Sequence, residues 1–184
     1  HMGCGNSDKP QQYQYQLKTH IDNLEHLLNE LDIDRYSLAV HDWGGAIGMG
    51  LAARQPDRIE SLVIFNTAAF RSARIPRRIS ICRVPILGDI IVRGLNGFAG
   101  AAISMAVTRP LESDVIRGYL QPYDSWANRI AVLRFVQDIP LSPRDASWET
   151  LLEVEKGLAL FRQTPMMILW GGRDFCFTRY FYNE

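Results

Sequence analysis

The stretch from residue 36 to residue 56 passes from an apolar strand directly into a helix crowded with glycine and alanine. "YSLAV" (36–40) predicts a short buried strand, and "GGAIGMGLAARQ" (44–55) predicts a helix that Pro56 ends. Each glycine inside a helix costs about 1 kcal/mol relative to alanine, so their number indicates a helix lying close against a sheet. So apolar a strand is typical of a parallel sheet covered on both faces. We therefore expect an α/β fold.

Helices and strands alternate around this unit. Leucine and isoleucine at helical spacing predict an amphipathic helix over about 16–31, while "SLVIF" (61–65) and "PMMILW" (165–170) predict two further buried strands. Helical segments are expected between these two strands, near 88–107, 111–120, 125–137 and 147–162.

The long helical excursion predicts three parts of the chain. Residues 1–66 form a core part with the strand-to-helix turn, 67–163 a helical insertion, and 164–184 a core strand followed by a loop. Three parallel strands leave both edges of the sheet open, and a complete domain normally covers such edges. We therefore expect the chain to be a piece of a larger domain, with its core truncated at both ends.

Composition argues against several classes of function. The 184 residues hold 20 basic and 20 acidic side chains, so no overall charge favours nucleic acid or a membrane. Cys4, Cys82 and Cys176 lie far apart without a CxxC pair, which argues against a disulfide framework or a zinc site. A reducing, cytoplasmic setting fits this cysteine usage best. The longest nearly apolar run, 95–107, is too short to span a bilayer.

Asp42 occupies the point where the first strand turns into the glycine-rich helix. Such a turn holds its pivot residue strained and projecting, as in the nucleophile elbow usually written G-x-S-x-G. Here Gly44 fills the second small position, Val40 stands at the first, and Asp42 replaces the serine. A carboxylate can displace a leaving group from a saturated carbon and form an ester that water later hydrolyses. The alternative is a helix cap, which Asp often provides.

Trp43 and Asp174 support the nucleophile interpretation. The backbone N–H of Trp43 would face the oxyanion formed during ester hydrolysis, and its indole N–H suits a departing anion. Asp174 follows the third strand by a few residues, a natural position for the acid that orients a catalytic histidine. The alternatives are plain packing for Trp43 and a turn residue after two glycines for Asp174.

None of the histidines stands where the catalytic base is needed. The four are His1, His20, His26 and His41. His20 and His26 belong to the first predicted helix, and His41 precedes Asp42 in the strand and so points away from it. We therefore expect this chain alone not to complete multiple turnovers.

Four segments together resemble the Asp-nucleophile α/β-hydrolases of the haloalkane dehalogenase group. They are "VHDWGGAIGMGLAARQPDRI", "NTAAF", "PYDSWANRIAVLRFVQDIPL" and "WGGRDFCF". They are especially similar to the branch that contains the β-lactone (cis-3-alkyl-4-alkyloxetan-2-one) decarboxylases. The resemblance implies a partial α/β-hydrolase fold with a helical cap over about 67–163. It implies Asp42 as nucleophile, Trp43 as leaving-group and oxyanion donor, and Asp174 as the acid. The family's upstream His-Gly loop and downstream histidine are absent from this sequence.

The resemblance also implies a hydrolase that acts on a small apolar substrate through a covalent ester. Carbon–halogen hydrolysis is the first candidate reaction, while β-lactone decarboxylation, epoxide hydrolysis and a catalytically silent chain stay open. Neither dehalogenation nor β-lactone decarboxylation needs a metal or an organic cofactor, and no nucleic acid is implied. In the epoxide case Tyr119 or Tyr123 would donate to the epoxide oxygen. With Trp126 these tyrosines are candidates for the substrate cavity, against ordinary packing of cap helices.

Arginines between residues 71 and 93 depart locally from the balanced charge. They would suit an anionic head group or an acidic partner, although such a cluster is more often a solvated face. A peripheral membrane contact, a protein partner and an oligomer therefore stay open.

Overall fold

The computed structural model describes residues 1–184 and separates into two compact units. The helical unit consists of His1–Tyr15 and Ile75–Ile139, and the sheet unit consists of Gln16–Arg74 and Pro140–Glu184. The three-part division expected from the sequence, with its boundaries at residues 66 and 163, stays a prediction.

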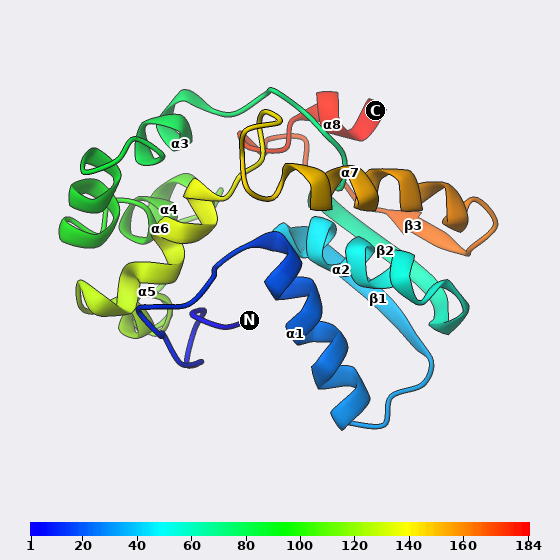
Figure 1. The fold of residues 1–184 in the computed structure, drawn as a ribbon. Helices are drawn as coiled ribbons and strands as arrows, with labels where there is room; N and C mark the ends of the chain where they lie inside the picture. Colours follow the sequence, from blue (N-terminus) through cyan, green and yellow to red (C-terminus); the bar gives the residue numbers. More distant parts are fainter. The chain divides into compact units, whose positions relative to one another are not determined.

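The sheet unit is built on three parallel strands, as the sequence predicts (Figure 1). The prediction that the third strand is buried is wrong for this chain, because all three residues of that strand, 166–168, are exposed. β1 (Tyr36–Asp42) pairs with β2 (Ile59–Thr67), and β2 pairs with β3 (Met166–Ile168), so β2 is the central strand. The pairing becomes irregular between Val40 and Asp42, where β1 ends. Because the strands are parallel, their carboxyl ends lie at one edge of the sheet, where open α/β sheets bind their ligands.

Three helices pack together beside this sheet (Figure 1). α2 (Trp43–Arg54) contacts β1 and β2, and it also packs against α1 (Leu17–Glu30) and α7 (Trp148–Gly157). The core of the unit includes the buried apolar side chains Leu17, Ile21, Ile47, Leu51, Leu62, Leu151 and Val154. The remaining elements of the unit are η1 (Pro56–Arg58), η5 (Leu158–Phe161) and α8 (Arg179–Asn183).

The expectation that both faces of β1 are covered is wrong for this chain. Val40 is buried, whereas Ser37, Ala39 and His41 are exposed on the opposite side of the strand. The sequence pattern does not reveal this alternation, because small residues rather than charged ones occupy two of the exposed positions.

The glycines of α2 allow the helix to approach the strands closely, as predicted. A Cβ atom on Gly45 would lie 1.8 Å from Oγ1 of Thr67, which belongs to β2. A Cβ atom on Gly48 would lie 2.7 Å from Cγ1 of Val40, which belongs to β1. Both distances are far inside van der Waals contact, so a larger residue at either position would force α2 away from the sheet.

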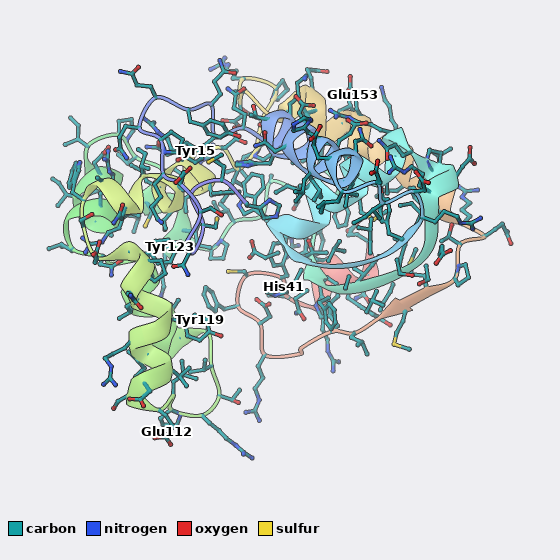
Figure 2. All side chains as sticks on the ribbon, turned by 90° about the horizontal axis from the view of Figure 1, so that it is seen from below. Tyr15, His41, Glu112, Tyr119, Tyr123 and Glu153 are labelled. Carbon is teal, nitrogen blue, oxygen red and sulfur yellow. The ribbon has the colours of Figure 1, made fainter.

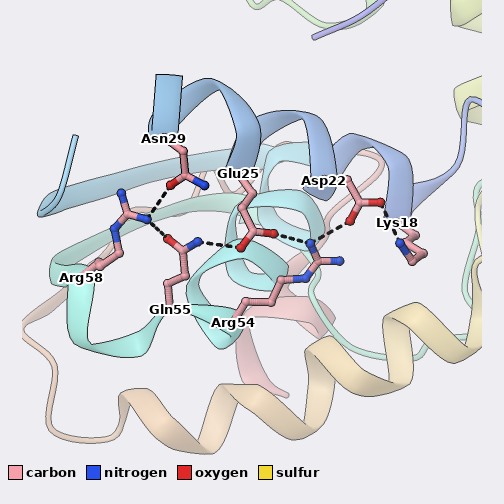
Figure 3. A network of polar contacts seen from close by, with 7 residues as sticks. All are labelled: Lys18, Asp22, Glu25, Asn29, Arg54, Gln55 and Arg58. Carbon is pink, nitrogen blue, oxygen red and sulfur yellow. Dashed lines mark hydrogen bonds and ion pairs between the residues drawn. The ribbon is translucent and has the colours of Figure 1, made fainter. Parts of the chain in front are cut away.

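A chain of polar contacts joins α1 to the end of α2 (Figure 3). Arg54 pairs with Asp22 at 2.8 Å and with Glu25 at 2.7 Å, and Gln55 Nε2 donates to Glu25 at 2.6 Å. The further members of this network are Lys18, Asn29 and Arg58. These side chains are partly exposed, so the network orients α1 against α2 more than it stabilises the unit.

The helical unit packs short helices around a small core of its own. Its buried cluster consists of Cys82, Val92, Leu133 and Val136. Its elements are α3 (Arg77–Cys82), the π-helix η2 (Asp89–Gly94), α4 (Ala99–Met105), α5 (Ser113–Leu120), η3 (Gln121–Tyr123), η4 (Ala127–Arg129) and α6 (Ile130–Gln137).

The helical unit departs from the sequence expectation in two places. α3 forms within a stretch that has no clean helical periodicity. Ile79 and Cys82 turn to the core, while Ile81, which is also apolar, is exposed. The helical stretch expected over 88–107 consists of two helices, separated at Asn96, whose φ is 52°. None of the helices in the structure combines the length and the apolar character that crossing a membrane requires.

Candidate active site

Asp42 lies at the turn from β1 into α2 with a backbone conformation that L-residues seldom adopt. Its φ is 51° and its ψ is −128°. A non-glycine residue in such a region costs roughly 1–3 kcal/mol and persists only where the surrounding structure imposes it. The strained pivot that the sequence predicts is confirmed, and the nucleophilic role of its carboxylate stays a prediction.

The Asp42 carboxylate also caps α2. Its Oδ1 accepts a hydrogen bond from the backbone N–H of Trp43 at 2.6 Å. Cap and nucleophile are therefore compatible roles, because a carboxylate has two oxygens and only one makes this bond. The same N–H would remain within reach of an oxygen that carries negative charge during ester hydrolysis.

The electrostatic surroundings of Asp42 favour its neutral form more than water does. Burial raises the pKa of the Asp42 carboxyl, and the neighbouring Asp174 carboxylate raises it as well. The Trp43 N–H and His41 act in the opposite direction and do not cancel the rise. A carboxyl group whose pKa is raised by burial and by a second carboxylate is typical of functional sites.

Asp174 organises the loop that follows β3. Its Oδ1 accepts the backbone N–H groups of Cys176 at 2.7 Å and of Phe177 at 2.9 Å. The indole N–H of Trp170 donates to the Phe177 carbonyl at 2.9 Å and closes the loop from its other side. Asp174 is therefore a turn residue, as one of the two sequence interpretations has it. The same hydrogen bonds hold its carboxylate in a fixed position.

Asn66 anchors this loop to the central strand. It is buried at the end of β2, and its side-chain amide makes three hydrogen bonds to the loop. Its Oδ1 accepts the Gly171 N–H at 2.7 Å, and its Nδ2 donates to the carbonyls of Gly171 at 3.0 Å and Phe177 at 3.2 Å. Both ends of the Asp174 loop are thereby attached to one side chain.

Thr67, the next residue of β2, holds the elbow. Its hydroxyl donates to the Asp42 carbonyl oxygen, and its side chain fills the space that Gly45 leaves open. Consecutive strand residues point to opposite sides, so Asn66 and Thr67 reach two different loops from one strand end. β2 thus positions Asp42 and Asp174 together.

Sequence reasoning missed both Asn66 and Thr67. The stretch "NTAAF" (66–70) stands out in the sequence only as one of the segments that carry the family resemblance, which assigns no role to Asn66 or Thr67. A signal was nevertheless present, because two polar residues interrupt an apolar run at the carboxyl end of a predicted central strand. Polar side chains need hydrogen-bond partners when they are buried. The loops that follow the neighbouring strands are the nearest segments that can supply such partners.

Cys176 adds a thiol to the surroundings of the two carboxylates. Burial raises its pKa to about 12, and Asp174 and Asp42 contribute in the same direction. The thiol is a free cysteine that stays protonated at neutral pH. It is consequently a poor nucleophile.

The histidines lie where the sequence places them. His20 is buried on α1, where burial lowers its pKa to about 4, and His26 is exposed on the same helix. His41 is exposed on β1, one residue before Asp42 (Figure 2). None of the four follows Asp174 in the chain.

The three aromatic candidates for a substrate cavity belong to the helical unit. Tyr119 lies on α5 and is 63% exposed, and Tyr123 follows in η3 (Figure 2). The Tyr123 hydroxyl accepts the Gly5 N–H at 3.0 Å, and the Arg93 guanidinium lies 4.5 Å from the Trp126 ring centroid. Their contact with a substrate stays a prediction.

Comparison with known proteins finds similarity to the same groups of enzymes that the sequence motifs resemble. Residues 1–80 match the family described as alpha/beta hydrolase fold. A cis-3-alkyl-4-alkyloxetan-2-one decarboxylase from Shewanella oneidensis is 46% identical, and one from Xanthomonas campestris is 42% identical; each alignment covers 98% of this chain. A haloalkane dehalogenase from Mycolicibacterium paratuberculosis is 31% identical over 94% of this chain.

Solved structures agree on the fold. A haloalkane dehalogenase from Bradyrhizobium elkani superposes with a TM-score of 0.85 at 23% identity, covering 93% of this chain and 61% of that one. A second from Agrobacterium tumefaciens gives a TM-score of 0.78 at 24% identity, covering 91% and 59%. Among the relatives in sequence, this chain spans 59%, 64% and 56% of their respective lengths. The predicted resemblance and the predicted fold class, a partial α/β-hydrolase, are confirmed.

Proposed function

We propose that this chain, which has the α/β-hydrolase fold, carries the nucleophile and the acid of a hydrolase of haloalkane dehalogenase type. The observation that carries the proposal is the strained turn at Asp42, where φ is 51° and a half-buried carboxylate accepts the first N–H of α2. A mere helix cap does not require this conformation, because Asp caps helices with ordinary extended dihedral angles.

In the first step an Asp42 oxygen attacks the carbon that bears the leaving group. The new carbon–oxygen bond forms as the carbon–halogen bond breaks, and the electron pair leaves with the halide. The Trp43 indole N–H is the proposed donor to that anion, since it can donate and cannot accept. The product of the step is an alkyl ester of Asp42 in an apolar substrate pocket.

In the second step water attacks the carbonyl carbon of the ester. A general base removes a proton from this water, and the Trp43 backbone N–H stabilises the oxyanion. We assign Asp174 to orienting a histidine that serves as this base, because the Asn66 clamp and the loop hydrogen bonds hold its carboxylate in a fixed place. The chain itself contains no histidine after His41, so the whole protein would have to supply it.

β-Lactone decarboxylation is the second candidate, and a specific finding favours it. The relatives at 46% and 42% identity bear the name of that reaction, whereas the dehalogenase relative is 31% identical. Both candidates use the Asp42 carboxylate against an electrophilic carbon of an apolar substrate. They differ in what is released: dehalogenation releases a halide, whereas decarboxylation opens the lactone ring, keeps the carboxylate attached, and releases carbon dioxide when the carbon–carbon bond to it breaks.

The two half-reactions give a direct test in this chain. A bromoalkane should convert the chain to a single alkyl ester that persists, because no base hydrolyses it. Intact mass and peptide mapping should place the adduct on Asp42, with one bromide released per chain. Asp42→Asn should show no adduct, whereas Asp174→Asn should retain it. An adduct on another residue, or equal labelling of Asp42→Asn, would contradict the nucleophile assignment.

The substrate class needs the whole protein. Side-by-side turnover of a haloalkane, an epoxide and a dialkyl β-lactone, with release of halide, diol or carbon dioxide as the readout, separates the candidates. Turnover confined to the β-lactone would replace dehalogenation with decarboxylation while leaving the role of Asp42 intact.

A further inference from the structure

The turn between α3 and η2 exposes an unusual number of large apolar side chains. Six of them form what we call the α3–η2 apolar surface: Ile81, Val84, Ile86, Leu87, Ile90 and Leu95. Single exposed apolar residues are ordinary, whereas a contiguous group marks a surface that binds something. Ile86 and Leu95 are 75% and 74% exposed, the largest values in this group.

Backbone hydrogen bonds place three of these side chains on one face of the helix. The Ile90 N–H donates to the Ile86 carbonyl at 3.0 Å, and the Leu95 N–H donates to the Ile90 carbonyl at 2.9 Å. Each bond joins residues about one turn apart, so Ile86 before η2, Ile90 within it and Leu95 at its end follow one another along one side. The opposite face carries Val92, which is 1% exposed in the core of the unit.

The tip of the surface is held outward by a strained turn. The Leu87 N–H donates to the Pro85 carbonyl at 2.7 Å, and Ile86 between them has a φ of 67°. This is a γ-turn with positive φ, which is rare and is costly for a β-branched residue. Gly88 then lies so close to the end of α3 that a Cβ atom would be 2.1 Å from the Cys82 carbonyl oxygen. The two helices therefore present Ile86 at a fixed corner.

The charge around this surface is positive. Between residues 75 and 107 the chain carries four arginines (Arg77, Arg78, Arg83 and Arg93) and a single acid, Asp89. Asp89 pairs with Arg93 at 3.5 Å, while Arg77 and Arg78 are exposed at the start of α3. Arg77 precedes the exposed Ile81 by one helical turn, so cationic and apolar side chains share a face of α3.

We propose that the α3–η2 apolar surface docks on an anionic phospholipid bilayer. Aliphatic side chains at a fixed corner suit the boundary between head groups and acyl chains, and adjacent arginines suit lipid phosphates. An acidic protein would also complement the arginines. Hot spots of protein interfaces, however, typically combine arginine with tyrosine or tryptophan anchors, and all six residues of this surface are aliphatic. The proposal is independent of the reaction assigned to Asp42.

Vesicle co-sedimentation tests the proposal with the chain itself. The chain should bind vesicles of phosphatidylcholine with about one third phosphatidylglycerol, and far more weakly those of phosphatidylcholine alone. Ile86→Asn and Leu95→Asn should each lower the partition coefficient by roughly 10-fold. Asparagine tolerates positive φ, so the variant at residue 86 should fold at least as well as the parent. The matched control is Leu31→Ser, since Leu31 is 58% exposed on the sheet unit.

The arginines have a matched control as well. The double variant Arg77→Gln, Arg78→Gln should weaken binding to the anionic vesicles by about 20-fold. Arg144→Gln with Arg162→Gln makes the same change in net charge on the sheet unit and should have little effect. Absence of binding to anionic vesicles, or equal losses in the Leu31 and Ile86 variants, would overturn the proposal. Self-association that Ile86→Asn abolishes, without vesicle binding, would overturn it too and identify an interface between copies.

Discussion

At the scale of single residues, the backbone of Asp42 shows how the neighbours of a reactive group hold it in an unfavourable conformation. Its positive φ costs roughly 1–3 kcal/mol. Three contacts oppose that cost: the Trp43 N–H at the carboxylate, the Thr67 hydroxyl at the carbonyl, and the close approach of α2 that Gly45 allows. Each of them can be removed separately.

Gly45 and Gly44 form a matched pair. Gly45→Ala should lower the free energy of unfolding by about 2–3 kcal/mol, because its Cβ atom would overlap Thr67 Oγ1. Gly44→Ala should change it by less than about 0.5 kcal/mol, since nothing lies within 4 Å of the position its Cβ atom would take. Urea unfolding measures both. Equal losses would mean that α2 does not lie on Thr67.

Two substitutions separate the contributions of the Thr67 hydroxyl and methyl groups. Thr67→Val keeps the shape and removes the donor to Asp42, so ester formation with a bromoalkane should slow by about 10-fold or more. Thr67→Ser keeps the donor and should react at nearly the parental rate while losing about 1 kcal/mol of stability. If the rate of ester formation in the two variants follows their stability and not the presence of the hydroxyl, Thr67 has a purely structural role.

His20 should make the stability of the chain depend on pH. Its pKa falls from 6.5 to about 4 in the folded state because burial disfavours the charged imidazole. Between those values the unfolded chain binds the extra proton, so stability is retained above pH 6.5 and declines as the pH falls towards 4. The decline should be about 3 kcal/mol by pH 4.

The comparison of two histidines on α1 isolates this effect. Urea unfolding at several pH values between 4 and 6.5 should show that His20→Gln removes most of the slope. His26→Gln should leave the slope unchanged, because His26 is exposed. A slope that survives in the His20 variant would assign the pH dependence to other groups.

At the scale of elements, the members of the polar network between α1 and α2 differ in how many ion pairs they make. Arg54→Met should lower the free energy of unfolding by about 1 kcal/mol, because Arg54 pairs with Asp22 and Glu25 while its side chain is 33% exposed. Lys18→Met should cost less than about 0.3 kcal/mol, since Lys18 pairs only with Asp22 and is 66% exposed. Moderate salt should reduce the difference between the stability losses of the two variants, because it screens ion pairs. A difference that persists in salt would point to packing of the aliphatic part of the arginine side chain.

The elements also show what a sequence can predict and why. The three strands, α1, α2 and the positions of Asp42 and Asp174 follow from apolar runs, glycine content and turn residues, all of which act locally. The roles of Asn66 and Thr67 depend on residues far along the chain, so no local pattern contains them. The same holds for α3 and η2, where apolar residues cover the buried and the exposed sides alike and leave no periodicity to detect.

At the scale of the whole molecule, the chain consists of two units with separate cores, and each carries a different part of the inferred function. The sheet unit holds Asp42, Asp174 and the residues that position them. The helical unit holds the α3–η2 apolar surface. Substitutions on that surface should therefore leave ester formation at Asp42 unchanged, and the Thr67 variants should leave vesicle binding unchanged.

The contact between Asn66 and Gly171 joins residues 105 positions apart, and this separation sets the order of assembly during folding. β1, α2 and β2 are neighbours in the chain and can condense early, while β3 must await the closure of a very long loop. The turn at Asp42 should consequently exist before Asp174 arrives beside it.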